Sequence, residues 1–144
     1  MSEFELHPRL AADTITLGDF PVCRALLMNE AQFPWVILVP KRAGITELYQ
    51  LSTDDRHQAQ EESRLISQLI MNHFKGDKLN TGAIGNMVPQ LHLHHIVRFT
   101  SDTVWPKPVW GNIATAKPYS DPCDIKSTLQ DLIKSHDKAF TPCE

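Results

Sequence analysis

The stretch that decides how this 144-residue chain folds is Gln90-Leu-His92-Leu-His94-His95-Ile-Val-Arg98. Successive side chains of a β-strand point to opposite faces of the sheet. A strand here therefore places Gln90, His92 and His94 on one face, while His95 and the intervening leucines point to the other. A single core-adjacent histidine is usually a hydrogen-bonded structural residue. Two imidazoles in register with a glutamine favour a functional site instead.

Two chemistries fit a pair of imidazoles two residues apart on a strand. Both rings can bind one zinc ion, but zinc needs a third protein ligand, and the other candidates lie in no recognisable metal motif. Those candidates are His7, His57 and His73. Alternatively, a neutral imidazole attacks a phosphoryl group to form a phosphoramidate that water later cleaves. Its neighbour then stabilises the negative charge that develops on the phosphoryl oxygens. The residues alone leave both chemistries open.

Five segments of the chain are expected to form β-strands. Trp35–Val39 is a continuous apolar run with β-branched residues between two prolines, which is typical of a buried strand. Two strands before it flank a turn at Gly18, since glycine adopts the positive φ that such turns often need. The predicted strands are residues 14–17, 22–28, 35–39, 78–84 and 90–99.

One long helix is the best-marked element of the sequence. Ser52 followed three residues later by Asp55 resembles a capping box, and Gly76 stands where a C-terminal stop is expected. A second helix is predicted after Asp121-Pro122, because proline is tolerated in the first turn. The order strand, strand, strand, helix, strand, strand, helix predicts an α+β fold. We expect an antiparallel sheet packed with the long helix and a C-terminal helix.

The chain length corresponds to roughly one domain. We predict a single domain over residues 1–144, with its core at about 4–99 and a C-terminal extension at 100–144. Residues 100–119 carry three prolines and two tryptophans and should be ordered but irregular, while the tail after His136 is expected to fray. A composition of 42% hydrophobic and 22% charged residues argues against disorder.

Charge and cysteine content narrow the partners and the compartment. A formal net charge of −3 argues against a dedicated duplex-binding surface, which is usually strongly basic, so no nucleic-acid partner is expected. No apolar run approaches the ~20 residues that cross a bilayer, and the acidic N-terminus lacks the features of a signal peptide. The three cysteines are dispersed and odd in number, which favours a reducing, cytoplasmic setting without a disulfide framework.

The strip Gln90–Ile96 resembles the signature of the histidine triad (HIT) family, His-x-His-x-His-x-x with hydrophobic residues at x, except that Gln90 stands in the first histidine position. Upstream, residues 25–29 and 34–41 resemble the family's strand pair ending in hydrophobic-Val-Pro-Lys, and residues 51–55 resemble the opening of its long helix. The order and spacing of these segments are those of the family. The chain is most similar to small bacterial HIT hydrolases.

The resemblance implies a HIT-like fold, a homodimer, and a hydrolase or transferase of nucleotidyl groups that needs no metal or other cofactor. Its small-molecule substrates would be nucleoside phosphoramidates or dinucleoside polyphosphates such as diadenosine tetraphosphate. By position, His92 would be the nucleophile that forms a nucleotidyl-histidine, and His94 would polarise the phosphate. Gln90 would supply the backbone carbonyl that fixes the nucleophile's other ring nitrogen. Asn29 matches the residue that hydrogen-bonds the ribose, and Asn86 falls near a polar residue of the phosphate loop.

Departures from the family pattern support two alternatives. Gln90 cannot relay a proton as histidine does, although its amide can donate to a phosphate oxygen. The loop Met87–Pro89 is short and apolar where many members carry groups that assist the leaving group. These departures favour, as one alternative, a nucleotide-binding or sensing protein with little turnover. The other alternative is a zinc-dependent hydrolase that uses His92 and His94.

Four further side chains near the strip are expected to be structural or solvated. His95 replaces the family's usual aliphatic residue and points to the opposite face, so we expect it to be structural. Arg98 is a candidate to contact a phosphate, but a solvated surface residue is the favoured interpretation. Trp105 and Trp110 are candidates to cover a base or a dimer partner, but packing in the core or at an interface is favoured.

Overall fold

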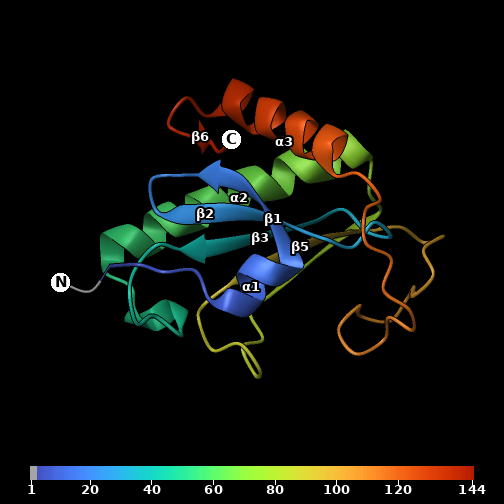
Figure 1. The fold of residues 1–144 in the computed structure, drawn as a ribbon, viewed down its shortest axis with the longest axis horizontal. Coiled ribbons are helices and arrows are strands. Elements are labelled where there is room, and N and C mark those ends of the chain that lie inside the picture. The colour runs from blue at the N-terminus through green and yellow to red at the C-terminus, as the bar shows by residue number, and fades with distance from the viewer. Residues whose placement is uncertain (1–2) are drawn as a thin grey trace.

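The computed structural model describes residues 3–144 and contains one six-stranded antiparallel sheet with helices on both faces (Figure 1). Residues 1–2 lie outside the described residues. The helices are α1 Pro8–Asp13, α2 Thr53–Phe74 and α3 Cys123–His136, with a short 3₁₀ turn at Leu48–Gln50. The strands are β1 Thr14–Asp19, β2 Cys23–Met28, β3 Trp35–Pro40, β4 Lys78–Gly82, β5 Leu93–Arg98 and β6 Thr141–Pro142. The predicted α+β class is confirmed.

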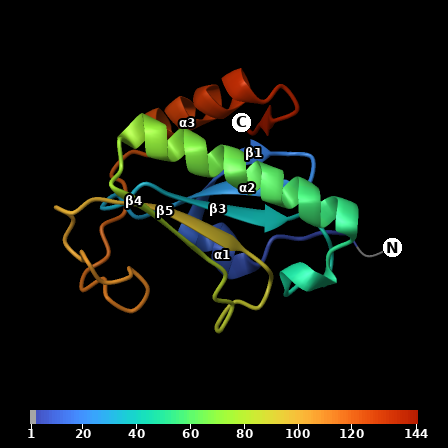
Figure 2. The ribbon, with the colours of Figure 1, turned by 180° about the vertical axis from the view of Figure 1, so that it is seen from behind.

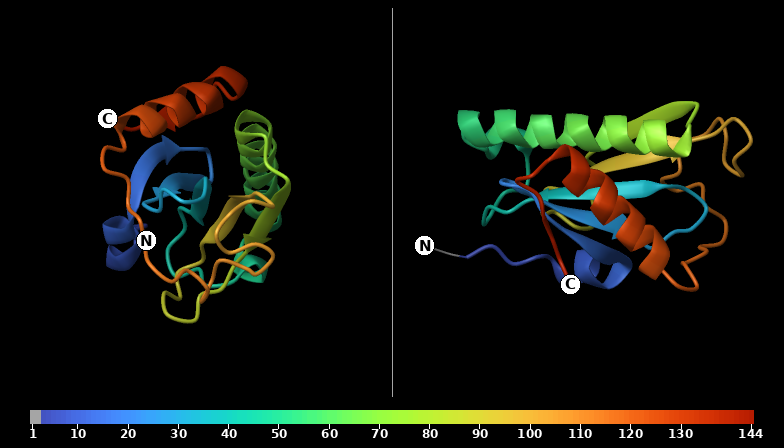
Figure 3. Two further views of the ribbon diagram at one scale, coloured as in Figure 1. Left: turned by 90° about the vertical axis from the view of Figure 1, so that its right-hand side faces the viewer. Right: turned by 90° about the horizontal axis from the view of Figure 1, so that it is seen from above.

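The sheet has the strand order β4-β5-β3-β2-β1-β6, and every neighbouring pair is antiparallel. Helix α2 crosses one face over β3 and β5 (Figure 2). Helix α3 lies beside α2 on that face, and α1 lies on the other (Figure 3). The predicted buried strand is confirmed, because every residue of β3 is buried. The histidine strand β5 pairs with β3 and therefore lies inside the sheet.

The histidine strand is shorter than predicted. It begins at Leu93 and not at residue 90, because β4 ends at Gly82 and offers no strand partner further along. Just before the strand, the backbone N–H of Leu91 donates instead to the carbonyl of Ile45 in the linker that precedes α2. Residues 90–92 therefore form an irregular approach to β5. Their side chains need not alternate between the two faces of the sheet.

Both ends of α2 lie where the sequence predicts, but the capping residues differ in part. The Ser52 hydroxyl accepts a hydrogen bond from the Asp55 backbone N–H (3.1 Å), as expected of an N-cap. The Asp55 carboxylate does not complete a capping box, since it pairs with Arg42 at 2.7 Å. At the C-terminus Lys75, one residue before the predicted stop at Gly76, adopts the left-handed conformation (φ 55°). Gly76 is needed for space, because a Cβ there would collide with the Val97 side chain.

The C-terminal tail is ordered, and the prediction that it frays was wrong. Phe140 is fully buried, with its ring centroid 4.9 Å from that of Phe20. Residues Thr141 and Pro142 then pair with β1 and become the edge strand β6. An aromatic anchor and a strand pairing therefore hold a segment whose sequence is polar and short. Within α3, Leu129 and Ile133 face the core.

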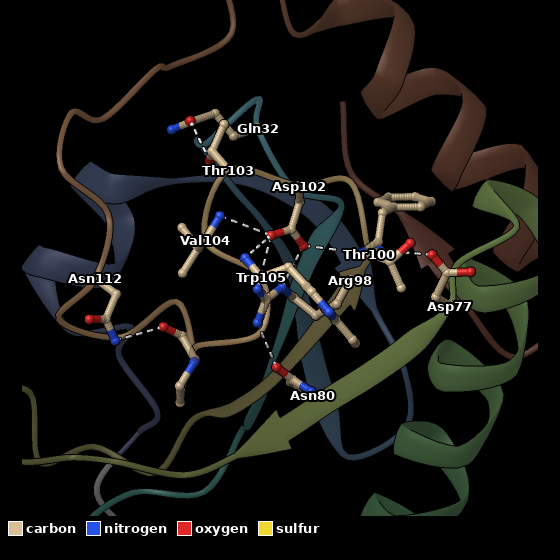
Figure 4. A network of polar contacts seen from close by, with 12 residues as sticks. Gln32, Asp77, Asn80, Arg98, Thr100, Asp102, Thr103, Val104, Trp105 and Asn112 are labelled. Atoms are coloured by element: carbon tan, nitrogen blue, oxygen red, sulfur yellow. Dashed lines mark hydrogen bonds and ion pairs between the residues drawn. The ribbon is translucent and has the colours of Figure 1, made fainter.

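Arg98 is buried, and the prediction of a solvated residue was wrong. Its guanidinium donates twice to the Asp102 carboxylate (2.8 and 3.0 Å) and once to the Asn80 side-chain oxygen (2.9 Å) (Figure 4). Burial alone would raise the pKa of Asp102, but hydrogen bonds from Arg98 and from three backbone N–H groups lower it to about 2. The pair fixes the start of the irregular segment 99–119, which lies over the face of the sheet opposite α2.

Candidate active site

His92 and His94 lie side by side at the start of β5. Their ring centroids are 4.9 Å apart with the planes inclined at 70°, and the side chains are only 7% and 6% exposed. Leu91 and Leu93 pack on the opposite side, in the core beneath α2. The structure therefore brings the two predicted imidazoles together on one side of the strand.

A backbone carbonyl fixes the proton of His92. Nδ1 of His92 lies 2.7 Å from the carbonyl oxygen of Gln90. Because a carbonyl oxygen only accepts hydrogen bonds, Nδ1 carries the proton. In the neutral ring the lone pair is then on Nε2.

The side chain of Gln90 is held away from the two imidazoles. Its oxygen accepts the backbone N–H of His7 (2.8 Å), and its amide nitrogen donates to the carbonyl of Glu5 (2.9 Å). The sequence suggested that this amide donates to a phosphate oxygen. In the structure it binds the segment before α1 instead. Of Gln90, the backbone carbonyl is the group that contacts His92.

His94 is enclosed by two indole rings. Nε1 of Trp35 donates to Nδ1 of His94 at 3.0 Å, and the Trp110 ring stands edge-on at a centroid distance of 5.4 Å. Burial, followed by the charges of His92 and His95, lowers the pKa of His94 to about 3. His94 is therefore neutral near pH 7, and because Nδ1 accepts, its proton is on Nε2.

A cavity of about 500 Å³ opens beside the two imidazoles. Neither Nε2 atom has a hydrogen-bond partner among residues 3–144, neither is completely buried, and both histidines line this cavity. The other lining residues come from α1, β2, the loop after β4 and the segment 99–119. They are Arg9, Leu10, Asp13, Met28, Ile84, Gly85, Asn86, Met87, Val88 and Trp110.

The two predicted nucleotide-binding asparagines line different cavities. Asn86 is part of the wall beside the imidazoles. Asn29 lines an adjoining cavity of about 390 Å³, which shares Asp13 and Met28 with the first. The side-chain oxygen of Asn29 accepts the Tyr119 backbone N–H at 3.0 Å. The structure thus places Asn29 next to the histidine cavity and not inside it.

His95 points into the core under α2, as predicted for a structural residue. Its Nδ1–H donates to the Val36 carbonyl (3.1 Å), and its Nε2 lies 2.7 Å from the Ser63 hydroxyl. Burial lowers the pKa of His95 to about 4, so the ring is neutral near pH 7. Both ring nitrogens are satisfied by the protein, which leaves His95 no group to offer a ligand.

Known proteins share this sequence and architecture. The family model described as HIT domain matches residues 9–101, which is well over half of the chain. The chain belongs to the histidine triad (HIT) family. No curated protein matches it. HIT proteins bind nucleotides and act as hydrolases, so the family assignment makes this chain a nucleotide-binding hydrolase.

Three solved bacterial HIT structures are similar to this HIT protein over nearly its whole length. A histidine triad protein from Marinobacter aquaeolei VT8 is 48% identical, with a TM-score of 0.89 over 93% of this chain and 98% of that one. One from Bradyrhizobium japonicum is 37% identical, with a TM-score of 0.86 over 92% and 98%. One from Sinorhizobium meliloti 1021 is 38% identical, with a TM-score of 0.84 over 92% and 96%. The HIT-like fold is confirmed.

The structure of this HIT protein gives the zinc alternative no third ligand. Within residues 3–144, no group of three or more histidine, cysteine, aspartate or glutamate side chains is placed to hold a metal ion. His7 has another role, since its Nδ1 accepts the Arg9 backbone N–H at the start of α1. None of the described helices is both long and apolar enough to cross a membrane.

Sequence reasoning missed two neighbours of His94 in this HIT protein. The sequence indicates Trp35 as part of a buried strand and Trp110 as a packing or base-covering residue, and it indicates neither as a neighbour of His94. The β3–β5 register pairs Trp35 with Ile96, so Trp35 and His94 are diagonal neighbours on one face of the sheet. Knowledge of that strand register would have identified Trp35 as a neighbour of His94. Trp110 lies in irregular structure, and no sequence pattern places it.

Proposed function

We propose that this HIT protein hydrolyses phosphoramidate or phosphoanhydride bonds at the α-phosphorus of nucleotides through a covalent nucleotidyl-histidine. The observation that carries the proposal is the pair of unlike Nε2 atoms in one cavity. His92 offers a lone pair and His94 offers an N–H. A nucleophile beside a neutral donor is the combination that attack on a phosphoryl group requires.

In the proposed reaction, Nε2 of His92 forms a bond to phosphorus as the bond to the leaving group breaks. The ring then carries a positive charge, which the Gln90 carbonyl stabilises through Nδ1–H. His94 donates its Nε2–H to a phosphoryl oxygen. Water cleaves the N–P bond in a second step, releases the nucleoside monophosphate and restores the neutral His92.

The two asparagines are proposed to hold the nucleotide. Asn29 is proposed to bind the ribose hydroxyls, because its amide nitrogen has no hydrogen-bond partner among residues 3–144 while its oxygen is fixed by Tyr119. Asn86 is proposed to contact the phosphate, since it lies in the wall beside the imidazoles. The volumes of the two adjoining cavities, about 390 and 500 Å³, support a nucleoside monophosphate unit as the bound group.

We also propose that the protein is a single-domain cytoplasmic homodimer. Exposed apolar side chains beside the cavity, Ile84 and Met87, support a self-association surface. Three cysteines without disulfide partners support a reducing compartment. Sedimentation at low micromolar concentration should show a dimer, and a monomer at all concentrations would contradict the dimer.

The second candidate is a nucleotide sensor with little turnover. It is favoured by one observation: the Gln90 amide is bound to the segment before α1 and does not face the imidazoles. Adenosine phosphoramidate and diadenosine tetraphosphate distinguish the two functions. Release of AMP supports the hydrolase, whereas tight binding of both compounds without product supports the sensor.

The decisive experiment tests His92 directly. Rapid quenching of the wild type with adenosine phosphoramidate should trap an acid-labile adduct on the peptide that carries His92. His92→Ala should lose turnover by roughly a thousandfold or more while still binding AMP, because it removes the attacking atom and few ground-state contacts. His57→Ala is the matched control, since His57 is exposed on α2. An adduct on His94, or near-normal turnover by His92→Ala, would overturn the mechanism.

A further inference from the structure

Two indole rings contact His94, but only one of them forms a hydrogen bond with it. Trp35 and Trp110 stand at similar centroid distances from the imidazole, 5.6 and 5.4 Å. Nε1 of Trp35 donates to Nδ1 of His94 at 3.0 Å. Nε1 of Trp110 is buried and has no hydrogen-bond partner among residues 3–144. The two tryptophans therefore provide similar packing and different hydrogen bonding.

The Trp35 hydrogen bond decides which nitrogen of His94 carries the proton. An indole N–H can only donate, so Nδ1 must present its lone pair. A proton on Nδ1 would bring two N–H groups together at 3.0 Å in a site that is nearly closed to water. With this bond in place, the neutral ring has its proton on Nε2, which opens onto the cavity.

Trp35 is itself held firmly. It begins β3, is 5% exposed, and packs with Leu26, Ile37 and Ile96 on the face of the sheet opposite α2. Its ring also lines the adjoining cavity that contains Asn29. A rigid side chain on the central part of the sheet can thus fix His94 within a narrow range of orientations.

We infer that Trp35 is a positioning residue that holds His94 as the Nε2–H tautomer, so that His94 meets the phosphoryl oxygens as a neutral donor. The effect on turnover rests on the proposed function, whereas the tautomer can be measured without any substrate. His94 then neither shuttles a proton nor carries a charge during the reaction. Protonation of the leaving group and deprotonation of the attacking water are then carried out by water and the leaving group, and not by His94.

Nitrogen NMR of the ¹⁵N-histidine-labelled protein tests the tautomer. In the wild type, His94 should show a protonated Nε2 and an unprotonated Nδ1 at neutral pH. Trp35→Phe keeps an aromatic ring and removes the donor, so the two tautomers should become mixed and both nitrogen signals should move. Trp110→Phe is the matched control, because it removes an N–H that bonds nothing, and the His94 signals should stay in the wild-type pattern.

Kinetics with adenosine phosphoramidate test the role in turnover. Trp35→Phe should lower kcat about tenfold and leave KM within about twofold, because the donor acts on the developing charge and not on ground-state binding. Trp105→Phe should match the wild type, since Trp105 lies over Arg98 and lines neither cavity. A changed tautomer with unchanged kcat would overturn the positioning role.

A second measurement avoids any dependence on the variant folding. In wild-type protein labelled at both residues, a ¹⁵N–¹⁵N coupling across the hydrogen bond should link Nε1 of Trp35 to Nδ1 of His94. Absence of that coupling, or equal effects of Trp35→Phe and Trp110→Phe on the His94 signals, would overturn the inference. A failure of the proposed function would appear separately, as no release of AMP by the wild type or as normal turnover by His92→Ala.

Discussion

Gln90 contacts His92 through its backbone, while its side chain binds the segment before α1. Any residue supplies a carbonyl, so the orientation of His92, the proposed nucleophile, does not require glutamine. Gln90→Ala should therefore lose less than about tenfold in kcat/KM with adenosine phosphoramidate. Steady-state kinetics check this, and a loss of a thousandfold would show that the side chain touches the substrate.

Arg98 and Asp102 form a buried ion pair whose separation should be costly. Asp102→Asn leaves the guanidinium, which is 1% exposed, without its charge partner. We expect a loss of about 3 kcal/mol in the free energy of unfolding, because an uncompensated buried charge remains. Asp13→Asn breaks the exposed pair with Arg9 and should cost less than about 1 kcal/mol. Urea denaturation of the three proteins measures both values, and equal losses would contradict the argument.

At the scale of elements, one carboxylate joins α2 to the sheet. Glu62 is 2% exposed, and its two oxygens accept the backbone N–H groups of Val22 and Cys23 at 3.0 and 2.6 Å. Glu62→Gln turns an amide N–H₂ toward one of these two donors, so we expect a loss of about 2–3 kcal/mol in the free energy of unfolding. Glu61→Gln, on the exposed side of the same helix, should change it by less than about 0.5 kcal/mol. Similar losses in chemical denaturation would show that the buried contacts are not the cause.

The elements that sequence predicts well are those specified by neighbouring residues. Ser52 marks the start of α2 because its hydroxyl caps a residue three positions away, and the apolar run 35–39 needs no partner to be read as buried. Contacts between residues far apart in the sequence cannot be predicted from a local pattern. The Gln90 side chain meets residues 83 and 85 positions earlier, and Phe140 packs on Phe20.

The candidate site likewise has a part that the sequence predicts and a part that it does not. The strip of alternating residues places His92 and His94 together, because a two-residue spacing at the start of one strand is a local property. The environment of His94 depends on how β3 pairs with β5 and on where an irregular segment carries Trp110. Arg98 was misjudged for that reason: its partner Asp102 lies in a loop whose path no periodic pattern describes.

For the whole molecule, two buried neutral histidines make stability depend on pH. The pKa is lowered to about 3 for His94 and about 4 for His95, chiefly by burial, whereas a histidine in the unfolded chain has a pKa near 6.5. Between these values the unfolded chain binds more protons than the native protein. The free energy of unfolding should therefore fall as pH drops from about 6.5 toward 4, by up to about 1.4 kcal/mol per pH unit for each residue.

Urea denaturation at a series of pH values measures this slope. His95→Gln should make the slope shallower, because one of the two protonation sites is gone. His57→Gln should leave the slope unchanged, since His57 is exposed on α2. Below about pH 4 a further loss is expected as Asp102, whose pKa is lowered to about 2, takes up its proton. A free energy of unfolding that stays constant between pH 7 and 5 would contradict the whole account.

The placement of the tryptophans also gives the molecule a built-in optical reporter. Of the three indoles in the sequence, two contact His94 and the third lies over Arg98. Indole emission responds to the polarity and hydrogen bonding of its surroundings, so filling the cavity should change the fluorescence of Trp35 and Trp110 while Trp105 supplies a steady background. Nucleotide occupancy should then be readable in real time, without a label, in the same protein that is being assayed.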